Sequence, residues 1–486
     1  MKKMTLCVLA VVAMLSCGEN RAVIKLITKN APRGTATIEA TIEIDGTIYS
    51  TDKIAPYTDV DTETNRFLFT YPVNATGSTK ISLKALTMDR CEIGTAFYKT
   101  EITNFEPMLE KTVTFDSHPR VESSIQSLLG IWGSKRTDKK QKASDIWAVG
   151  ANGTLFHWDG VCWTDWQNAT ITTSASFNKS TLAVVDGIRD SDVWVVGENQ
   201  TFGHWDGAAW NFNVMKTGTL NPGTVTALRV FSSNDAWVTG LSGASFILYS
   251  WDGQSWIDRK NISNTENITT DVMNTVGQKD QIYAIAGTNS ADMMLAGFSR
   301  SKSLGNEMPG LMTKCNSVGS GCSKNGVDQN TAFYPISLGT GADITPDYTA
   351  AWTASENDYW FGVGYDDKAS PKNGARVVHW LNGTLNQPEI IDLESTTILV
   401  DYIWGTKNTD GLYDIWVNVY YREVMDPLIK SRVYRKKNNG PFELQTDGRV
   451  TGKTFTAIWG SSDSDVWLVG LNGLRVHWDG EKYTTY

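Results

Sequence analysis

The sequence predicts an all-β protein, a seven-bladed β-propeller preceded by a small antiparallel β-sandwich of immunoglobulin-like size. A set of short tryptophan-containing steps recurs seven times after residue 130, with 43 to 66 residues between equivalent positions. That spacing is near the period of four-stranded propeller blades. Before residue 118 the chain has no tryptophan and contains period-two segments such as 37–44, which predict strands buried on one face.

The last repeat defines the unit most clearly. Ile458-Trp459-Gly460-Ser461 is followed by Asp465-Val466-Trp467-Leu468-Val469-Gly470 and then by Val476-His477-Trp478-Asp479-Gly480. We expect the first strand to end in the first step, the second to run through the second step, and the third to end in the last. The closing Asp-Gly pair predicts a tight hairpin to a fourth strand, because both residue types accept positive φ.

The Asp-x-Trp step locates all seven repeats. It begins at Asp145, Asp192, Asp235, Asp358, Asp414 and Asp465, with a degenerate copy at Asp292. A blade cannot bury both of its faces alone, so tryptophans that bury roughly 150 to 250 Å² each are expected to pack between blades. The sequence leaves open whether the first and last blades exchange a strand, which residues 118–130 would supply.

These steps resemble the repeats of predicted surface lipoproteins from myxobacteria and related bacteria. The resemblance covers residues 131–486. It implies a propeller fold and a surface location, and it implies no activity.

The N-terminal residues predict where the protein is located. Lys2 and Lys3 precede a short apolar stretch, and Met14-Leu15-Ser16-Cys17 resembles a bacterial lipobox. We expect a lipoprotein signal peptide at 1–16 and lipidation of Cys17. A lipid on Cys17 would be the protein's membrane partner and would anchor it at the outer membrane or cell surface. The alternative is an ordinary secretory signal with an incidental cysteine.

The predicted domain boundaries follow from this signal sequence and from the repeats. They are a lipidated tether at 17–21, a β-sandwich spacer at 22–117 and the propeller at 118–486.

Composition narrows the partners and cofactors. The net charge of -9 and pI near 5.2 argue against a nucleic-acid protein, which needs a basic face. Cys315 and Cys322 flank a Gly/Ser-rich stretch and are candidates for a disulfide. No further metal ligands lie near them in the sequence, so we expect no metal and no cofactor.

The recurring polar residues are expected to be structural. His157, His204, His379 and His477 share one repeat position, and positions repeated around a propeller cannot converge on one metal. The repeated aspartates are expected to accept backbone N–H groups in the preceding turn. No serine elbow, zinc helix or phosphate loop is present, so no catalytic residue is expected.

Departures from the repeat predict the binding face. Long inserts separate the second and third strands of three successive repeats, at 298–309, 365–375 and 418–430, and repeat insertions often form binding loops. The ligand-binding candidates there are Arg300, Lys302, Tyr365, Asp366, Lys368, Tyr420, Tyr421 and Arg422. The alternative is that these are tolerated surface loops.

Three functions fit this sequence. The first is a non-enzymatic surface module that recognises an extracellular protein or polysaccharide. The second is an extracellular polysaccharide hydrolase or lyase, which predicts a carboxylate cluster or a metal in the axial pocket, with raised carboxylate pKa values. The third is a structural subunit of an envelope assembly.

Overall fold

The structure is a computed structural model. It describes residues 21–29, 37–56, 65–72, 74–86, 91–103, 108–114, 116–117, 126–134, 143, 145–166, 172–173, 180–215, 224–242, 245–259, 281–298, 310–315, 336–337, 343–344, 347–364, 375–386, 389–392, 397–422 and 429–486. In these ranges the chain is all-β, with short 3-10 turns at Ala151–Gly153, Glu198–Gln200, Ser290–Asp292 and Leu471–Gly473. No helix among them is long and apolar enough to cross a membrane.

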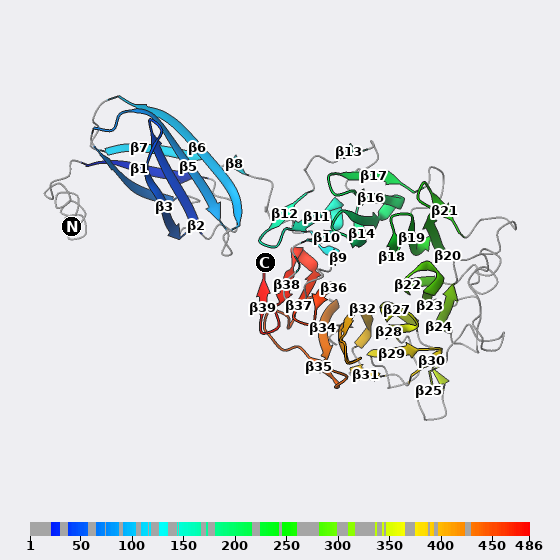
Figure 1. The fold of residues 1–486 in the computed structure, drawn as a ribbon. Coiled ribbons are helices and arrows are strands. Elements are labelled where there is room, and N and C mark those ends of the chain that lie inside the picture. The colour runs from blue at the N-terminus through cyan, green and yellow to red at the C-terminus, as the bar shows by residue number, and fades with distance from the viewer. Residues whose placement is uncertain are drawn as a thin grey trace. The chain divides into compact units, whose positions relative to one another are not determined.

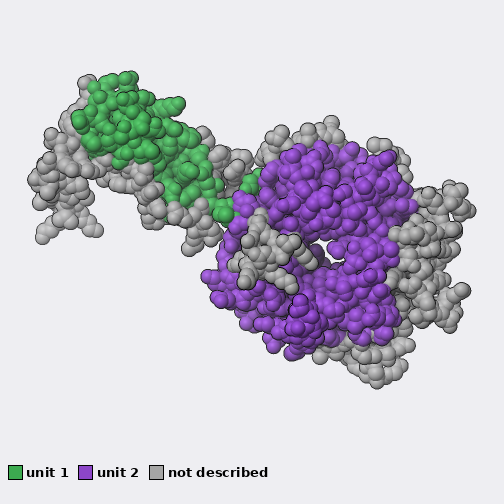
Figure 2. Space-filling view, viewed as in Figure 1, with its two compact units in different colours: residues 1–123, 161–165 green, residues 124–160, 166–486 purple. Residues whose placement is uncertain are grey.

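The chain forms two compact units, coloured separately in Figure 2. Unit 1 comprises Met1–Ser123 with Val161–Asp165, and unit 2 comprises Ser124–Gly160 with Trp166–Tyr486. The lipidation site, Cys17, lies outside the described residues.

Unit 1 contains a three-stranded sheet in the order β4-β1-β7 and a five-stranded sheet in the order β3-β2-β5-β6-β8 (Figure 1). The strands are β1 (Arg21–Lys29), β2 (Thr37–Ile44), β3 (Thr47–Pro56), β4 (Asn65–Pro72), β5 (Gly77–Leu86), β6 (Glu92–Ile102), β7 (Met108–Thr114) and β8 (Asp116–Ser117). The alternation predicted over 37–44 is confirmed, because every second side chain of β2 is buried.

One apolar core joins the two sheets of unit 1. Ile24 of β1 and Val113 of β7 belong to the same buried cluster as Ile42 of β2 and Leu83 of β5. The expectation of a purely antiparallel unit is wrong at one pair, since β1 and β7 run parallel. Parallel neighbours need a long connection, and the strands between β1 and β7 supply it.

A disulfide joins Cys91 to Cys162, with 5.6 Å between their Cα atoms. The sequence analysis did not identify this pair, because the partners lie 71 residues apart. The disulfide predicted between Cys315 and Cys322 stays a prediction. Cys322 and the side chain of Cys315 lie outside the described residues.

From residue 128 on, the described residues form seven sheets of three to five strands, which we number 1 to 7 in chain order, and one two-stranded sheet of β25 (Ile336–Ser337) and β26 (Asp343–Ile344). All of these strands belong to unit 2 except β12 (Trp163–Asp165), which belongs to unit 1. Sheet 1 is β9 (Leu128–Gly133), β10 (Ile146–Gly150), β11 (Leu155–Trp158) and β12 (Trp163–Asp165); sheet 2 is β13 (Thr172–Thr173), β14 (Leu182–Arg189), β15 (Asp192–Gly197), β16 (Thr201–Trp205) and β17 (Trp210–Val214); sheet 3 is β18 (Thr224–Ser232), β19 (Asp235–Ser242), β20 (Ser245–Trp251) and β21 (Trp256–Asp258); sheet 4 is β22 (Gln281–Gly287), β23 (Met293–Phe298) and β24 (Gly310–Cys315). Sheet 5 is β27 (Asp347–Ser355), β28 (Asp358–Gly364), β29 (Ala375–Leu381), β30 (Thr384–Leu385) and β31 (Glu389–Asp392); sheet 6 is β32 (Thr397–Lys407), β33 (Tyr413–Arg422), β34 (Ile429–Lys436) and β35 (Phe442–Leu444); sheet 7 is β36 (Phe455–Ser462), β37 (Asp465–Gly470), β38 (Arg475–Trp478) and β39 (Tyr483–Thr485).

The sheets of unit 2 form a ring (Figure 1). The first long strand of each sheet is innermost, and β9, β14, β18, β22, β27, β32 and β36 each pack against the next, with β36 returning to β9. Such radial packing of antiparallel sheets about one axis is the arrangement of a β-propeller. The predicted strand positions are confirmed in sheet 7, where β36 contains the Ile-Trp-Gly step and β37 begins at Asp465.

The ring closes by side-chain packing between sheets 7 and 1. Each of these two sheets consists of consecutive strands in the described part of the chain, so neither borrows a strand from the other. The Thr456 hydroxyl donates to the carbonyl of Leu128 at 2.6 Å, and Trp158 packs on Trp467 with 5.0 Å between ring centroids. Thr226 and Thr349 make the same hydroxyl-to-carbonyl bond to the sheets that follow theirs.

Candidate functional site in the axial pocket

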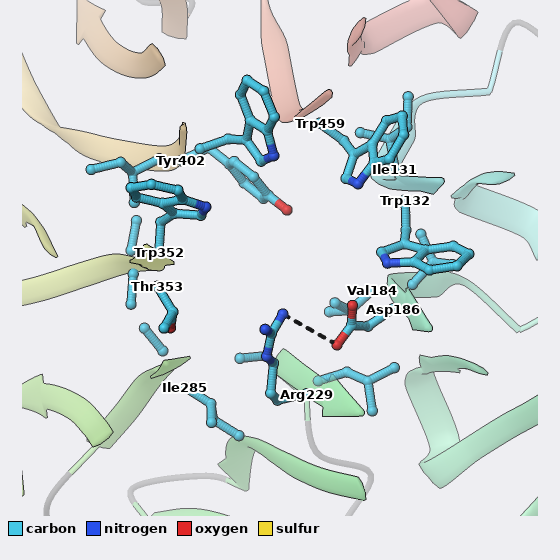
Figure 3. A pocket seen from close by; sticks show the side chains of 18 of the residues that line it. Ile131, Trp132, Val184, Asp186, Arg229, Ile285, Trp352, Thr353, Tyr402 and Trp459 are labelled. Atoms are coloured by element: carbon cyan, nitrogen blue, oxygen red, sulfur yellow. Dashed lines mark ion pairs between the residues drawn. The ribbon is translucent and has the colours of Figure 1, made fainter. Parts of the chain in front are cut away.

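A cavity of about 460 Å³ lies at the centre of the ring and is lined by the innermost strands of all seven sheets. Its size is within the ordinary range for small-molecule sites. Figure 3 shows the side chains that surround it, several of them aromatic and one pair charged. The charged residues that line it are Asp186, Arg229 and Asp401.

Much of the pocket wall comes from a single repeat position, the second residue of the Ile-Trp-Gly step. That position is tryptophan in sheets 1, 5, 6 and 7, aspartate in sheet 2, arginine in sheet 3 and alanine in sheet 4; the residues are Trp132, Trp352, Trp404, Trp459, Asp186, Arg229 and Ala286. The pocket therefore has an aromatic wall from four consecutive sheets and an ionic wall from sheets 2 and 3.

Glycine in the following sheet sets the position of each tryptophan. A Cβ built on Gly133 would lie 2.6 Å from the Trp459 ring, and a Cβ on Gly460 would lie 2.6 Å from the Trp404 ring. Gly187 and Gly405 are similarly close to the rings of Trp132 and Trp352, at 2.9 and 3.1 Å. In all four pairs the benzo edge of the indole covers the glycine, which leaves the nitrogen edge free to face the pocket.

The indole nitrogens do face the pocket. Figure 3 shows those of Trp132, Trp352 and Trp459 turned toward its open centre. In the described part of the chain, none of the four pocket indoles has a hydrogen-bond partner. A tryptophan N–H usually finds an acceptor when it is buried, so these donors are available to water or to a ligand.

Asp186 and Arg229 form an ion pair on the opposite wall. Arg229 Nη1 lies 3.7 Å from Asp186 Oδ2, and Nε donates to the Gly287 carbonyl at 3.2 Å. Asp186 also accepts the backbone N–H of Val230 at 2.8 Å. Asp186 is almost fully buried, whereas about a third of the Arg229 side chain is exposed. The guanidinium is thus held in place and remains open to the pocket.

Asp401 is the third charged residue of the lining. It occupies the repeat position where Thr226, Thr349 and Thr456 bond to the following sheet. Burial raises the pKa of Asp401 to about 7, although hydrogen bonds from Tyr420 and Asn418 act in the opposite direction. Its carboxyl group therefore changes charge near neutral pH.

Tyr402 contributes a hydroxyl beside both carboxylates. Burial raises its pKa above the usual value, and the charges of Asp186 and Asp401 add to the rise while Arg229 opposes it. The phenol stays protonated and is a hydrogen-bond donor at any physiological pH. No described residue accepts a hydrogen bond from it.

The structure places one sequence-predicted site residue beside the axial pocket. Tyr420 donates to Asp401, and burial together with that carboxylate raises the pKa of the tyrosine. Tyr421 is buried, with the Arg432 guanidinium 4.2 Å from its ring centroid. Arg300, Lys302, Tyr365, Asp366, Lys368 and the side chain of Arg422 lie outside the described residues, so their role in binding stays a prediction.

The predicted inserts do interrupt the expected connections. The gaps between β23 and β24 and between β28 and β29 coincide with the predicted inserts 298–309 and 365–375. The insert predicted at 418–430 is wrong at both ends, because β33 continues to Arg422 and β34 begins at Ile429, which leaves only 423–428 between them. Because the Ile-Trp-Gly step ends the innermost strand, its tryptophans lie toward the opposite end of the sheets from these connections.

The repeated aspartates and histidines form a second set of polar contacts. His477 Nε2 lies 2.6 Å from Asp465 Oδ1, and the pairs of His157 with Asp145, His204 with Asp192 and His379 with Asp358 measure 2.8, 2.8 and 2.7 Å. Each histidine also stacks on the tryptophan of the Asp-x-Trp step in its own repeat, with 4.1 to 4.2 Å between centroids.

The second oxygen of these aspartates accepts from the adjacent sheet. Asp192 accepts from the Ser233 hydroxyl, and Asp465 from the backbone N–H of Ala143 at 2.7 Å. The expected acceptance of backbone N–H groups from the preceding turn is therefore wrong for these carboxylates. The described residues include no group of three or more His, Cys, Asp and Glu side chains placed to hold a metal ion.

The residues that line the axial pocket were not predicted from the sequence. The signal was present in the Ile-Trp-Gly step, where two adjacent repeats replace tryptophan by Asp186 and Arg229. Oppositely charged residues at one inward-facing position of neighbouring repeats indicate an ion pair at the axis. Insertions change the length of a repeat, whereas this signal lies in the identity of the residues at one position.

Comparison with known proteins adds little. No protein-family model matches the chain, and no curated protein is similar enough to match. Among solved structures, YCF48 bound to D1 peptide is similar at 12% identity and a TM-score of 0.46, with 75% of this chain and 98% of that chain covered. YCF48 from Cyanidioschyzon merolae is similar at 12% identity over the same shares, with a TM-score of 0.44. A luciferin-regenerating enzyme is similar at 10% identity and a TM-score of 0.32, over 58% of this chain and 80% of that chain. Likenesses this distant say nothing of ligand or activity.

Proposed function

We propose that this protein is a lipid-anchored recognition module of the bacterial surface. In this proposal each of the seven sheets is one blade of a closed propeller, unit 1 is a β-sandwich spacer, and a lipid on Cys17 holds the protein at the outer membrane. The propeller binds an extracellular protein or polysaccharide and performs no catalysis.

The observation that supports this function most directly is the composition of the axial pocket. If the second residue of the Ile-Trp-Gly step only packed against neighbouring sheets, the same residue type could serve in every repeat. Instead it is tryptophan on one wall of the pocket and Asp186 or Arg229 on the other. Indole donors without a described acceptor and a partly exposed arginine are groups that orient a ligand.

A second candidate function is polysaccharide hydrolysis or elimination. The raised pKa of Asp401, about 7, is in the range of a general acid and favours it. Such chemistry commonly uses two carboxylates. The other described carboxylate of the lining, Asp186, is committed to Arg229 and to the Val230 amide. Catalysis would therefore need a second carboxylate beyond Asp401 and Asp186, whereas recognition needs only the hydrogen-bond donors of the described lining.

A binding screen tests the proposal. The purified full chain would be screened against arrayed glycans and solubilised envelope proteins, beside the double variant Trp352→Ala/Tyr402→Phe and the control Trp478→Phe. Trp478 lies on β38, away from the pocket lining. We expect the double variant to lose binding and the control to retain it.

Three other outcomes would each indicate a different site or function. Binding that survives the double variant and disappears when 299–309, 365–374 and 423–428 are shortened would move the site to those inserts. Turnover of a bound glycan that Asp401→Asn abolishes would establish the enzyme instead. A partner that co-purifies at fixed stoichiometry regardless of pocket substitutions would favour the envelope-subunit alternative.

A further inference from the structure

The described lining of the axial pocket presents several hydrogen-bond donors that point toward its centre. Four indole N–H groups and the Tyr402 hydroxyl have no described acceptor, and Arg229 has N–H groups beyond those that face the Gly287 carbonyl and Asp186. The hydroxyls of Thr349 and Thr456, at the repeat position of Asp401, already donate to the backbone carbonyls of Val400 and Leu128. A ligand that displaces water from these donors must supply several acceptor oxygens, because each donor left unpaired weakens binding.

The net charge of the pocket disfavours a strongly charged ligand. Arg229 is offset by Asp186 at 3.7 Å, so an anion would have to compete with a carboxylate that is already bound. Asp401 is the remaining charged residue of the described lining, which includes no lysine and no second arginine. Two or more uncompensated cations would be expected in a site for sulfate, phosphate or uronate groups.

These two properties identify a chemical class. Hydroxyl groups accept from one neighbour and donate to another, and their hydrogens rotate to suit. A sugar ring therefore satisfies converging indole donors and still donates to Asp401 or to bound water. A peptide segment brings one N–H donor per residue, for which the described lining has few free acceptors.

We propose that the axial pocket binds an uncharged oligosaccharide whose hydroxyl and ring oxygens accept hydrogen bonds from the indole N–H groups of Trp132, Trp352, Trp404 and Trp459. This deepens the proposed recognition function and rests on it. Arg229 and Tyr402 also donate into the pocket. The glycine beneath each indole holds the donor at the angle that points its N–H inward.

Tryptophan-to-phenylalanine substitutions isolate the N–H groups. Phenylalanine keeps an aromatic ring over the glycine and removes the donor. Titration calorimetry would compare wild type with Trp352→Phe, Trp459→Phe and their double variant, using neutral maltose-, cellulose-, xylan- and chitin-derived oligosaccharides as probes. We expect at least one series to bind, with each single variant weakening its affinity roughly three- to tenfold and the double variant weakening it further.

Two controls make the result interpretable. Trp478→Phe also removes an indole donor, which bonds to the Asp463 carbonyl at 3.3 Å outside the pocket, and should leave affinity unchanged. The melting temperature and near-UV circular dichroism of each variant separate lost binding from lost folding.

Three outcomes would overturn the inference. They are unchanged affinity in the double variant, preferential binding of polygalacturonate or heparin oligosaccharides, and binding of a peptide in place of any glycan. A peptide whose binding requires Trp352 would refute the sugar and leave the recognition function standing. If no probe and no envelope protein binds the full chain at all, the recognition function fails as well.

Discussion

Trp459 of the last sheet lies directly over Gly133 of the first, so close that a Cβ on Gly133 would approach its ring to 2.6 Å. This contact is part of the seam that closes the ring. The same relationship between Trp132 and Gly187 joins sheets 1 and 2, so the pocket tryptophans both line the axis and connect neighbouring sheets.

Gly133→Ala should destabilise the ring. The added methyl group forces Trp459 to move, and overpacking of this kind costs about 1–3 kcal/mol. The midpoint of thermal unfolding should fall, and oligosaccharide affinity should fall with it because Trp459 loses its orientation. Gly448→Ala is the matched control, since a Cβ there has no atom within 4 Å. Equal melting temperatures for the two variants would show that the seam tolerates the methyl group.

Asp358→Asn should destabilise the protein by about 3 kcal/mol at pH 7, because it breaks a buried charge pair. Burial raises the pKa of Asp358, but hydrogen bonds from His379, Lys407 and Tyr413 outweigh this effect and lower it to about 2. All three bonds measure 2.7 Å, and two of them come from sheet 6.

The pH dependence of that loss has a definite sign. The folded-state pKa of Asp358 is lower than the ordinary value of 3.8, so its contribution is present above pH 3.8 and disappears as pH falls toward 2. Denaturant unfolding at pH 7 and at about pH 2.5 should therefore show a smaller difference between wild type and variant at the lower pH. Asp410→Asn, at an exposed turn, should change stability little at either pH.

Asp401→Asn should stabilise the protein above neutral pH, in contrast to Asp358→Asn. Its folded-state pKa of about 7 lies above the ordinary value of 3.8, so the charged form opposes folding. The penalty is absent below pH 3.8, grows as pH rises and is complete above pH 7. The variant should be more stable than wild type by about 1–3 kcal/mol at pH 8, less than the full shift implies because Asp401 is only partly buried, and should match it at pH 4.

Chemical denaturation of both proteins across this pH range would measure the difference. A variant that is less stable than wild type at pH 8 would mean that the charged carboxylate stabilises the fold, which would contradict the raised pKa.

Non-reducing peptide mapping should recover Cys91 and Cys162 in one disulfide-linked peptide, since the structure joins them. Cys91→Ser/Cys162→Ser should lower the melting temperature, because the cross-link closes a loop of 71 residues. Recovery of Cys91 linked to Cys315 or Cys322 would contradict this pairing. A separate peptide linking Cys315 to Cys322 would establish the disulfide predicted from their spacing.

Local patterns account for what could be predicted from the residues alone. Period-two alternation depends on neighbouring residues only, and it located β2. The recurring Ile-Trp-Gly and Asp-x-Trp steps located the first two strands of sheet 7. Asp-Gly and Asn-Gly pairs marked hairpins because positive φ is a property of the individual residue, as at Gly480 and Gly160. The all-β class and the positions of the repeats therefore follow from short stretches of neighbouring residues.

The pocket, the seam and the pairing of β1 with β7 depend on contacts between residues far apart in the chain. Trp459 meets Gly133, and Asp465 meets Ala143, only because the ring returns to its start. Asp186 and Arg229 have no local partner in the sequence, and their ion pair exists because adjacent inner strands point the same repeat position at one axis. The raised pKa of Asp401 likewise comes from burial, which belongs to the closed ring and to no single strand.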